Sequence, residues 1–334
     1  MSRKDHIKKL VCICLIVILV LVILYSGLRI LESTVFLKDQ NSESNGESRL
    51  IEKNGVTYAP RNDITVIMLL GIDEYGPVKD SGSYNNTGEA DMVALLIFDE
   101  ATEKVNVLAL NRDTMLEMPA LGIGGKQAGT QYGQLALSHT FGSGLKDSCK
   151  NTETAVSGFL HNLDIDYYIS MNMDTISILN DAVGGVTVEV VDDFSQVDPT
   201  ITKGKLTLNG QQAVTYVQVR QNVSDQKNIS RMNRQKAYME GFLSAFKEKC
   251  QDDEFVSATF DEISPYVVTD FTTKSISNMI NRYAEYTLGE IVTPEGENVL
   301  KGEHYEFYAD EAALEDLILR LFYIPKSNGH LSEN

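Results

Sequence analysis

Two carboxylates and one guanidinium lie directly beside three apolar segments that have the length of buried strands. Asp73 follows the first segment, Asp91 precedes the second and Arg112 follows the third. Only residues 99–103 separate the second segment from the third, so these two should form an antiparallel hairpin with Asp91 and Arg112 at one edge. Asp73 joins them if the first segment runs parallel to the third. The three segments span residues 64–70, 92–98 and 104–110.

The alternative to a binding site is a purely structural role for these three residues. Aspartates are common in turns, and arginines pair with them on surfaces. Their common edge favours a binding site, because binding loops gather at the edges of α/β sheets. Carboxylate oxygens are hard ligands that favour Mg²⁺ or Mn²⁺ over Zn²⁺. We therefore expect a divalent cation on Asp73 and Asp91.

A second group of polar side chains begins the helix that we expect over residues 230–249. Arg231, Arg234 and Gln235 have i, i+3, i+4 spacing and share one face of that helix. Arg220 lies just upstream. Cations are unusual at a helix N-terminus, where the macrodipole and the free amide groups favour an anion. Because arginine binds phosphate oxygens bidentately, the pattern indicates a phosphate site, with a solvated basic face as the alternative.

Several function classes are disfavoured by the sequence. It contains no H-E-x-x-H, Walker loop, G-x-S-x-G or C-x-x-C, which argues against zinc hydrolases, P-loop ATPases, serine esterases and thiol oxidoreductases. The 47 acidic residues outnumber the 29 basic ones, which argues against a nucleic-acid partner. Four cysteines are too few for a disulfide scaffold. Cys149 and Cys250 are expected either to pair or to remain two buried thiols.

The N-terminal segment has the properties of a membrane anchor. Residues 10–28 carry no charge and, as a helix, nearly span the ~30 Å hydrocarbon core of a bilayer. The run is longer than the apolar region of a signal peptide and no cleavage site follows it. Four of the first nine residues are basic, so the positive-inside rule places them in the cytoplasm and the remainder outside. The expected parts are a cytoplasmic tail (1–9), a transmembrane helix (10–31), an extracellular stalk (32–62), one catalytic domain (63–326) and a C-terminal tail (327–334).

Downstream of the first three strands the pattern alternates between helices and strands. This order predicts an α/β fold, an α/β/α sandwich with a mixed central sheet. Residues 119–148 are rich in Gly and Gln and are expected to be either a mobile cover over the site or a plain loop. The expected helices cover residues 152–163, 174–183, 230–249, 273–287 and 311–323, and the further strands cover 167–173 and 186–191.

Seven short motifs, taken in order, resemble those of the LytR-CpsA-Psr family of cell-wall glycopolymer transferases. The likeness covers residues 64–247 and, more loosely, the rest of the exported chain. The motifs are LLGIDEYG (69–76), GEAD (88–91), LNRDT (110–114), DIDYYISMN (164–172), DAVGGVTVEV (181–190), LNGQQAVTYVQVR (208–220) and SRMNRQK (230–236).

The resemblance implies an apolar cavity for a polyprenyl chain and a phosphotransfer reaction. A teichoic acid or capsular polysaccharide moves from its polyprenyl pyrophosphate carrier to peptidoglycan, with pyrophosphatase activity as a related reaction. Asp73 and Asp91 match the magnesium-associated carboxylates, and Asp91, Arg112 and Arg231 are the expected catalytic residues. Asp91 is also the candidate for taking the proton of the acceptor hydroxyl, unless the cation occupies both carboxylates. The expected pyrophosphate contacts are Arg112, Arg220, Arg231, Arg234 and Gln235.

The chain departs from the family pattern at three positions of the expected site. The family commonly has Arg where this chain has Glu89, Lys near Gln134, and a first Arg of R-x-R where this chain has Gln218. A site for a multiply charged anion thus lacks three cations, which suggests slow transfer or a less charged donor. The main alternative to the enzyme is a scaffold protein that binds polyprenyl phosphates without turnover. A membrane-tethered transcription regulator fits poorly, because most of the chain is acidic and expected outside the cell.

Overall fold

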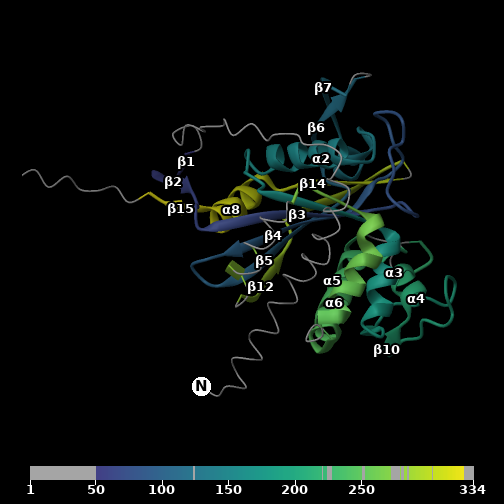
Figure 1. Cartoon of the computed structure of the whole chain (residues 1–334). Helices are drawn as coiled ribbons and strands as arrows, with labels where there is room; N and C mark the ends of the chain where they lie inside the picture. The colour runs from purple at the N-terminus through teal and green to yellow at the C-terminus, as the bar shows by residue number, and fades with distance from the viewer. Residues whose placement is uncertain are drawn as a thin grey trace, which may run out of the picture.

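In the described part of the chain, the central sheet has six strands and is mixed (Figure 1). The computed structural model describes residues 50–122, 125–219, 221–223, 228–249, 253–271, 279, 282–283, 286–302 and 304–326. In the order β11-β8-β3-β4-β5-β12, the β3–β8 and β5–β12 pairs are parallel and the others antiparallel. The strands are β3 (Ile64–Ile72), β4 (Ala90–Asp99), β5 (Lys104–Leu110), β8 (Tyr167–Asn172), β11 (Val267–Thr269) and β12 (Thr287–Val292).

Both faces of this sheet are buried, which is why β3 and β4 are apolar along nearly their whole length. Successive residues of a strand point to opposite faces, so each strand contributes to two separate cores. The cross-strand partners Ile67 and Leu96 belong to one core, and the partners Met68 and Leu95 belong to the other. The sheet is therefore the middle layer of the fold.

Helices form the outer layers. One core is closed by α3, α4, α5 and α6, and the other by α2 and α8. The expectation of an α/β/α sandwich with a mixed sheet is confirmed. The helices are α2 (Lys146–Phe159), α3 (Met173–Ala182), α4 (Gly210–Gln218), α5 (Asn228–Lys249), α6 (Asp253–Ile263) and α8 (Glu311–Phe322), with 3₁₀ turns η3 (Leu135–Thr140) and η4 (Ser264–Tyr266).

Four small antiparallel sheets surround these layers among the residues that the structure describes. The first sheet consists of β1 (Ile51–Lys53), β2 (Val56–Pro60) and β15 (Tyr323–Pro325). The other three are strand pairs: β6 (Met115–Leu121) with β7 (Gln127–Gln134), β9 (Val186–Val190) with β10 (Gly204–Leu208), and β13 (Gly296–Lys301) with β14 (His304–Ala309).

Two of these sheets correct expectations from the sequence. Residues 51–60, expected within the stalk, form β1 and β2, and β2 pairs with β15 near the end of the described chain, so these residues belong to the folded domain. The segment 119–148 is neither a cover nor a plain loop. It contributes to the β6–β7 hairpin, to η3 and to the start of α2, because Leu116 and Met118 of β6 are buried and hold the polar β7 outside.

The expected helices over 174–183, 230–249 and 311–323 are confirmed as α3, α5 and α8. The helix expected over 152–163 begins earlier, at Lys146. Most of the helix expected over 273–287 lies outside the described residues, and Thr287 begins β12. The expected anchor (10–31) also lies outside them, and among the described residues no helix is long and apolar enough to cross a membrane.

Candidate functional site

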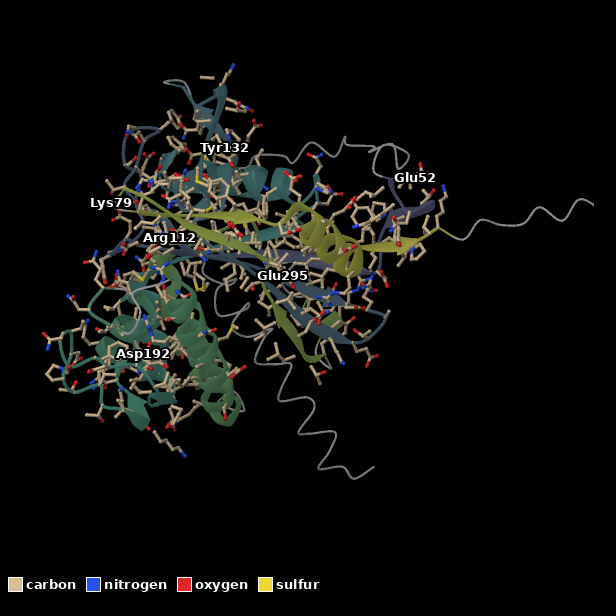
Figure 2. All side chains as sticks on the ribbon, turned by 180° about the vertical axis from the view of Figure 1, so that it is seen from behind. Glu52, Lys79, Arg112, Tyr132, Asp192 and Glu295 are labelled. Carbon is tan, nitrogen blue, oxygen red and sulfur yellow. The ribbon has the colours of Figure 1, made fainter. Side chains whose placement is uncertain are left out.

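The edge of the sheet brings Asp73, Asp91 and Arg112 together as the sequence predicts. Both β3 and β5 are antiparallel to β4, so Asp73 after β3 and Arg112 after β5 lie beside the start of β4. The register between β3 and β4 shifts there, from Gly71–Met92 to Ile72–Ala90. Asp91 is thus the extra residue of a β-bulge, a device that re-aims side chains at sheet edges and beside active sites. In Figure 2, Arg112 lies far from Glu52, which marks the opposite end of the molecule.

Arg112 is surrounded by carboxylates. Its Nη1 donates to Asp91 and its Nη2 donates to Glu89. Its Nε lies 3.6 Å from Oδ1 of Asp113. Arg112 keeps only 14% of its side chain exposed and the Asp91 side chain 7%, so this pair is held largely away from water. Charge-assisted hydrogen bonds of this kind fix the plane of the guanidinium.

Arg231 approaches the same carboxylate from α5. Its Nη1 lies 3.2 Å from Oδ2 of Asp91, and its side chain is 4% exposed. Asp91 therefore binds Arg112 with one oxygen and Arg231 with the other. One carboxylate holds two guanidiniums from different elements at fixed positions, and such pre-organised cations suit a phosphate group.

Arg234 has a different surrounding from the one that the resemblance implies. Its Nε donates to the carbonyl of Tyr216 at 2.8 Å, its Nη2 donates to the carbonyl of Val219, and its Nη1 lies 2.5 Å from Asp192. All three nitrogens thus bind the protein itself. Nε and Nη2 satisfy carbonyls at the end of α4, and Nη1 pairs with Asp192. We assign Arg234 a structural role rather than a pyrophosphate contact.

Arg220 lies outside the described residues. Gln235 lines the cavity described below, and its Nε2 donates to the carbonyl of Val217 at 3.3 Å.

Asp73 is bound to the amide of Gln218, at one of the positions where the family pattern has a cation. Gln218 Nε2 donates to Asp73 Oδ1 at 2.7 Å, and Tyr75 Oη donates to Gln218 Oε1 at 3.0 Å. This contact with Asp73 is neutral on the glutamine side. Asp73 is exposed, so the carboxylate remains accessible from solvent.

The carboxylates fit a divalent cation that is shared with a substrate. Among the described residues, no cluster of three or more His, Cys, Asp or Glu side chains could hold a metal by itself. Mg²⁺ is usually held by one or two carboxylates together with substrate phosphates and water. Asp73 and Asp91 supply hard oxygen donors at one edge, so they fit that kind of site.

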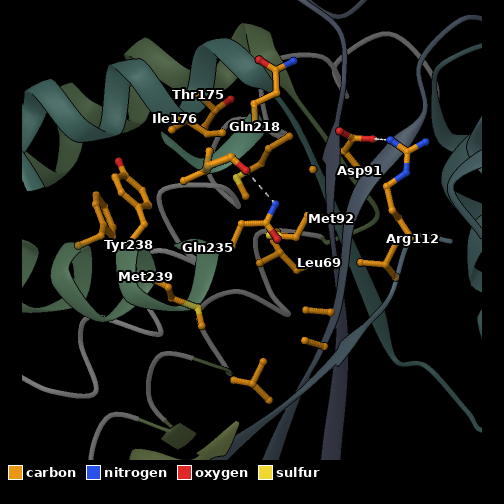
Figure 3. A pocket seen from close by; sticks show the side chains of 18 of the residues that line it. Leu69, Asp91, Met92, Arg112, Thr175, Ile176, Gln218, Gln235, Tyr238 and Met239 are labelled. Atoms are coloured by element: carbon orange, nitrogen blue, oxygen red, sulfur yellow. Dashed lines mark hydrogen bonds and ion pairs between the residues drawn. The ribbon is translucent and has the colours of Figure 1, made fainter. Parts of the chain in front are cut away.

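An apolar cavity of about 350 Å³ opens at the same edge and includes Asp91 and Arg112 in its wall (Figure 3). It lies between one face of the sheet and helices α3 and α5. Its floor contains Ala94 and Ala109, which are direct partners on β4 and β5. Two adjacent small side chains leave room in an otherwise tightly packed layer. The helix side of the cavity is formed by Thr175, Ile176, Leu179, Gln235, Tyr238, Met239 and Phe242.

His139 is a buried group near the site that the sequence did not single out. Its Nδ1 lies 2.8 Å from the carbonyl oxygen of Gly88, at the start of the segment that carries Glu89 and Asp91. Burial lowers the pKa of His139 to about 4, although the Gly88 carbonyl and the carboxylates of Asp147 and Glu74 oppose this shift. The neutral ring therefore donates its Nδ1 proton to Gly88. A histidine at residue 139 of 334 gives no local signal for this contact, because η3 brings it to the site from a distant part of the chain.

The pKa of His139 predicts an acid-dependent loss of stability. The folded protein keeps His139 neutral down to about pH 4, whereas the unfolded chain binds the proton near the ordinary histidine pKa of 6.5. Stability is therefore lost as the pH falls through this window, by about 3 kcal/mol in total. His139→Asn keeps a donor for Gly88 and should show a smaller loss of unfolding free energy between pH 6.5 and 4.5. The exposed His304→Asn is the control. Equal pH dependence of wild type and His139→Asn would contradict this prediction.

The comparisons with known proteins agree with the motifs. The model of the LytR_cpsA_psr family matches residues 31–319. The chain belongs to this family. The relatives include the polyisoprenyl-teichoic acid–peptidoglycan teichoic acid transferases TagU of Bacillus anthracis and Bacillus subtilis. The first is 26% identical over 85% of this chain and 83% of the relative, and the second is 24% identical over 78% of each.

Several solved structures share the fold of this chain. Protein gbs0355 from Streptococcus agalactiae superposes with a TM-score of 0.63 at 19% identity and covers 78% of this chain and 86% of its own. TagV from B. subtilis gives a TM-score of 0.57 at 21% identity, and the superposition covers 78% of this chain and 96% of TagV. A structure of TagT bound to LI-WTA gives a TM-score of 0.56 at 19% identity, and the superposition covers 78% of this chain and 90% of TagT. At these identities the likeness supports the fold of the family.

Proposed function

We propose that the protein is a membrane-anchored phosphotransferase that moves a glycopolymer from a polyprenyl pyrophosphate carrier to peptidoglycan outside the cell. The observation that carries this proposal is the apolar cavity with Asp91 and Arg112 in its wall and Arg231 bound to the same carboxylate. A polyprenyl pyrophosphate has a matching structure, a long apolar chain joined to a charged diphosphate. The names of the relatives support a teichoic acid as the polymer, and a capsular polysaccharide is the alternative cargo.

The cavity volume is at the low end of ligand pockets, which measure roughly 300–1,000 Å³. We therefore place only the isoprenoid units nearest to the diphosphate inside it. Tyr238, Met239 and Phe242 of α5 would contact these units, and the diphosphate would lie at the sheet edge. The rest of the lipid would remain with the membrane, to which the expected N-terminal anchor holds the domain, with the N-terminus in the cytoplasm.

In the proposed reaction, an acceptor hydroxyl of peptidoglycan attacks the phosphorus that carries the glycopolymer. A new P–O bond forms, the bond from that phosphorus to the bridging oxygen breaks, and polyprenyl monophosphate leaves. Arg112 and Arg231 stabilise the charge that develops on the phosphate oxygens, which is the principal task in phosphoryl transfer. Asp91 holds both guanidiniums in place, and we propose it, with Asp73, as the ligand of Mg²⁺ or Mn²⁺. The cation would add charge neutralisation at the diphosphate. A carboxylate of this edge takes the hydroxyl proton.

Release of phosphate from a polyprenyl pyrophosphate by the purified full-length protein tests this proposal against the scaffold alternative. We expect magnesium-dependent release, with water replacing the acceptor. A protein that binds the lipid but releases no phosphate, with or without added peptidoglycan, would be a scaffold. This experiment distinguishes the phosphotransferase from the scaffold protein, because both hypotheses predict lipid binding and only the first predicts turnover.

A further inference from the structure

The described part of the site contains more negative than positive groups. Arg112 and Arg231 are its cations, because Arg234 is bound to Asp192 and to backbone carbonyls. Three carboxylates, those of Glu89, Asp91 and Asp113, lie against these two guanidiniums. The carboxylate of Asp73 lies at the same edge, where it binds Gln218. A diphosphate is itself strongly anionic, so it meets a site whose cations are already neutralised.

Among the carboxylates around Arg112, that of Glu89 is the most exposed. Its side chain is 38% exposed, compared with 7% for Asp91 and 2% for Asp113. The Arg112–Glu89 pair is partly exposed on the glutamate side, and ion pairs contribute less to stability the more exposed they are, whereas breaking a buried pair is costly. Glu89 can therefore leave Arg112 without disturbing the fold, while the two buried carboxylates stay in place.

The backbone around Glu89 is held firmly, so only its side chain is free to move. The Glu89 carbonyl accepts hydrogen bonds from the backbone N–H groups of Asp73 at 2.9 Å and Asp91 at 3.1 Å. The carbonyl of the preceding residue, Gly88, is bound by His139. A rotation of the Glu89 side chain would uncover Arg112 Nη2, the nitrogen that it now occupies.

We propose that Glu89 is a displaceable internal anion that occupies Arg112 in the free protein and restricts the site to diphosphates that carry a divalent cation. This inference rests on the proposed function. A free diphosphate must displace Glu89 and then lies beside an uncompensated carboxylate, which opposes binding. A diphosphate with Mg²⁺ brings a positive charge that the released carboxylate can face, and carboxylate oxygens suit this ion. Glu89 thus acts as a specificity residue that makes binding depend on the cation.

Calorimetric titration of inorganic pyrophosphate into the full-length protein tests the proposal. The titrations compare wild type, Glu89→Gln and Glu103→Gln, each with Mg²⁺ and with a chelator. Gln keeps the shape of Glu89 and removes its charge. Glu103 is a matched control, because it is an exposed glutamate in the turn at the other end of the same β4–β5 hairpin, about 20 Å or more away.

Without Mg²⁺, we expect Glu89→Gln to bind pyrophosphate at least tenfold more tightly than wild type. With Mg²⁺ the difference should shrink to less than about threefold, and Glu103→Gln should match wild type in both conditions. Equal affinities of wild type and Glu89→Gln in the chelator, while wild type binds with Mg²⁺, would overturn the role of Glu89 alone. If none of the proteins binds pyrophosphate in either condition, both this inference and the diphosphate site of the proposed function fail.

Discussion

Arg231→Ala lowers phosphate release from a polyprenyl pyrophosphate at least tenfold, which corresponds to about 1.4 kcal/mol of lost transition-state stabilisation. Arg231 is one of two described guanidiniums at the sheet edge, and its Nη1 lies 3.2 Å from Asp91. Its removal leaves Arg112 as the one guanidinium that the described part of the chain places at a transferred phosphate. It also removes one of the two cations that position Asp91. Arg231→Lys keeps the positive charge and loses the planar guanidinium, so its activity should lie between those of wild type and Arg231→Ala.

The matched control for this prediction is Arg282→Ala. Arg282 is an exposed arginine that pairs with Glu100 at 2.5 Å, near the turn that joins β4 to β5 and away from the site. Its loss should leave activity within about twofold of wild type. Because Arg231 is buried, the unfolding midpoints of both variants must be measured alongside activity. Wild-type activity in a folded Arg231→Ala protein would contradict the assigned role.

Ala109→Phe should weaken the binding of a long-chain polyprenyl phosphate at least tenfold. Ala109 lies beside Ala94 on the cavity floor, so a phenyl ring there would fill space that we assign to the isoprenoid chain. The substitution touches none of the charged groups, so affinity for inorganic pyrophosphate should stay within about twofold. Lipid and pyrophosphate titrations of the same preparation measure both effects.

Ala128→Phe adds the same ring at an exposed position of β7 and serves as the control. It should change neither affinity. If Ala109→Phe binds the lipid as wild type does, the isoprenoid chain lies elsewhere on the protein. If it loses pyrophosphate binding as well, the ring has disturbed the sheet edge, and the separation of an apolar from a charged subsite would be wrong.

The sequence predicts the centre of the site because strand order and hairpin geometry are local properties. Residues 92–98 and 104–110 are separated by a short turn, so their pairing places Asp91 and Arg112 at one edge without knowledge of the rest of the fold. The spacing of Arg231 and Gln235 likewise follows from a single helix. These inferences depend on contacts between neighbouring segments.

The parts that the sequence does not predict depend on contacts between distant segments. The strands β1 and β2 have polar neighbours and become ordered through β15, which lies more than 250 residues further along the chain. Arg234 shares a helix face with Arg231 in the sequence pattern, yet the end of α4 and Asp192 determine its partners. His139 reaches Gly88 through η3. No spacing rule within one element indicates these contacts.

Covalent transfer can be measured with purified full-length protein, Mg²⁺, a polyprenyl pyrophosphate-linked glycan labelled in the sugar, and peptidoglycan. We predict that label becomes covalently attached to peptidoglycan, that polyprenyl monophosphate appears in equal amount, and that both fall at least tenfold in Arg231→Ala. Attachment of no label by the wild-type protein, while the lipid remains bound and intact, would contradict the account and identify the protein as a carrier of lipid-linked intermediates.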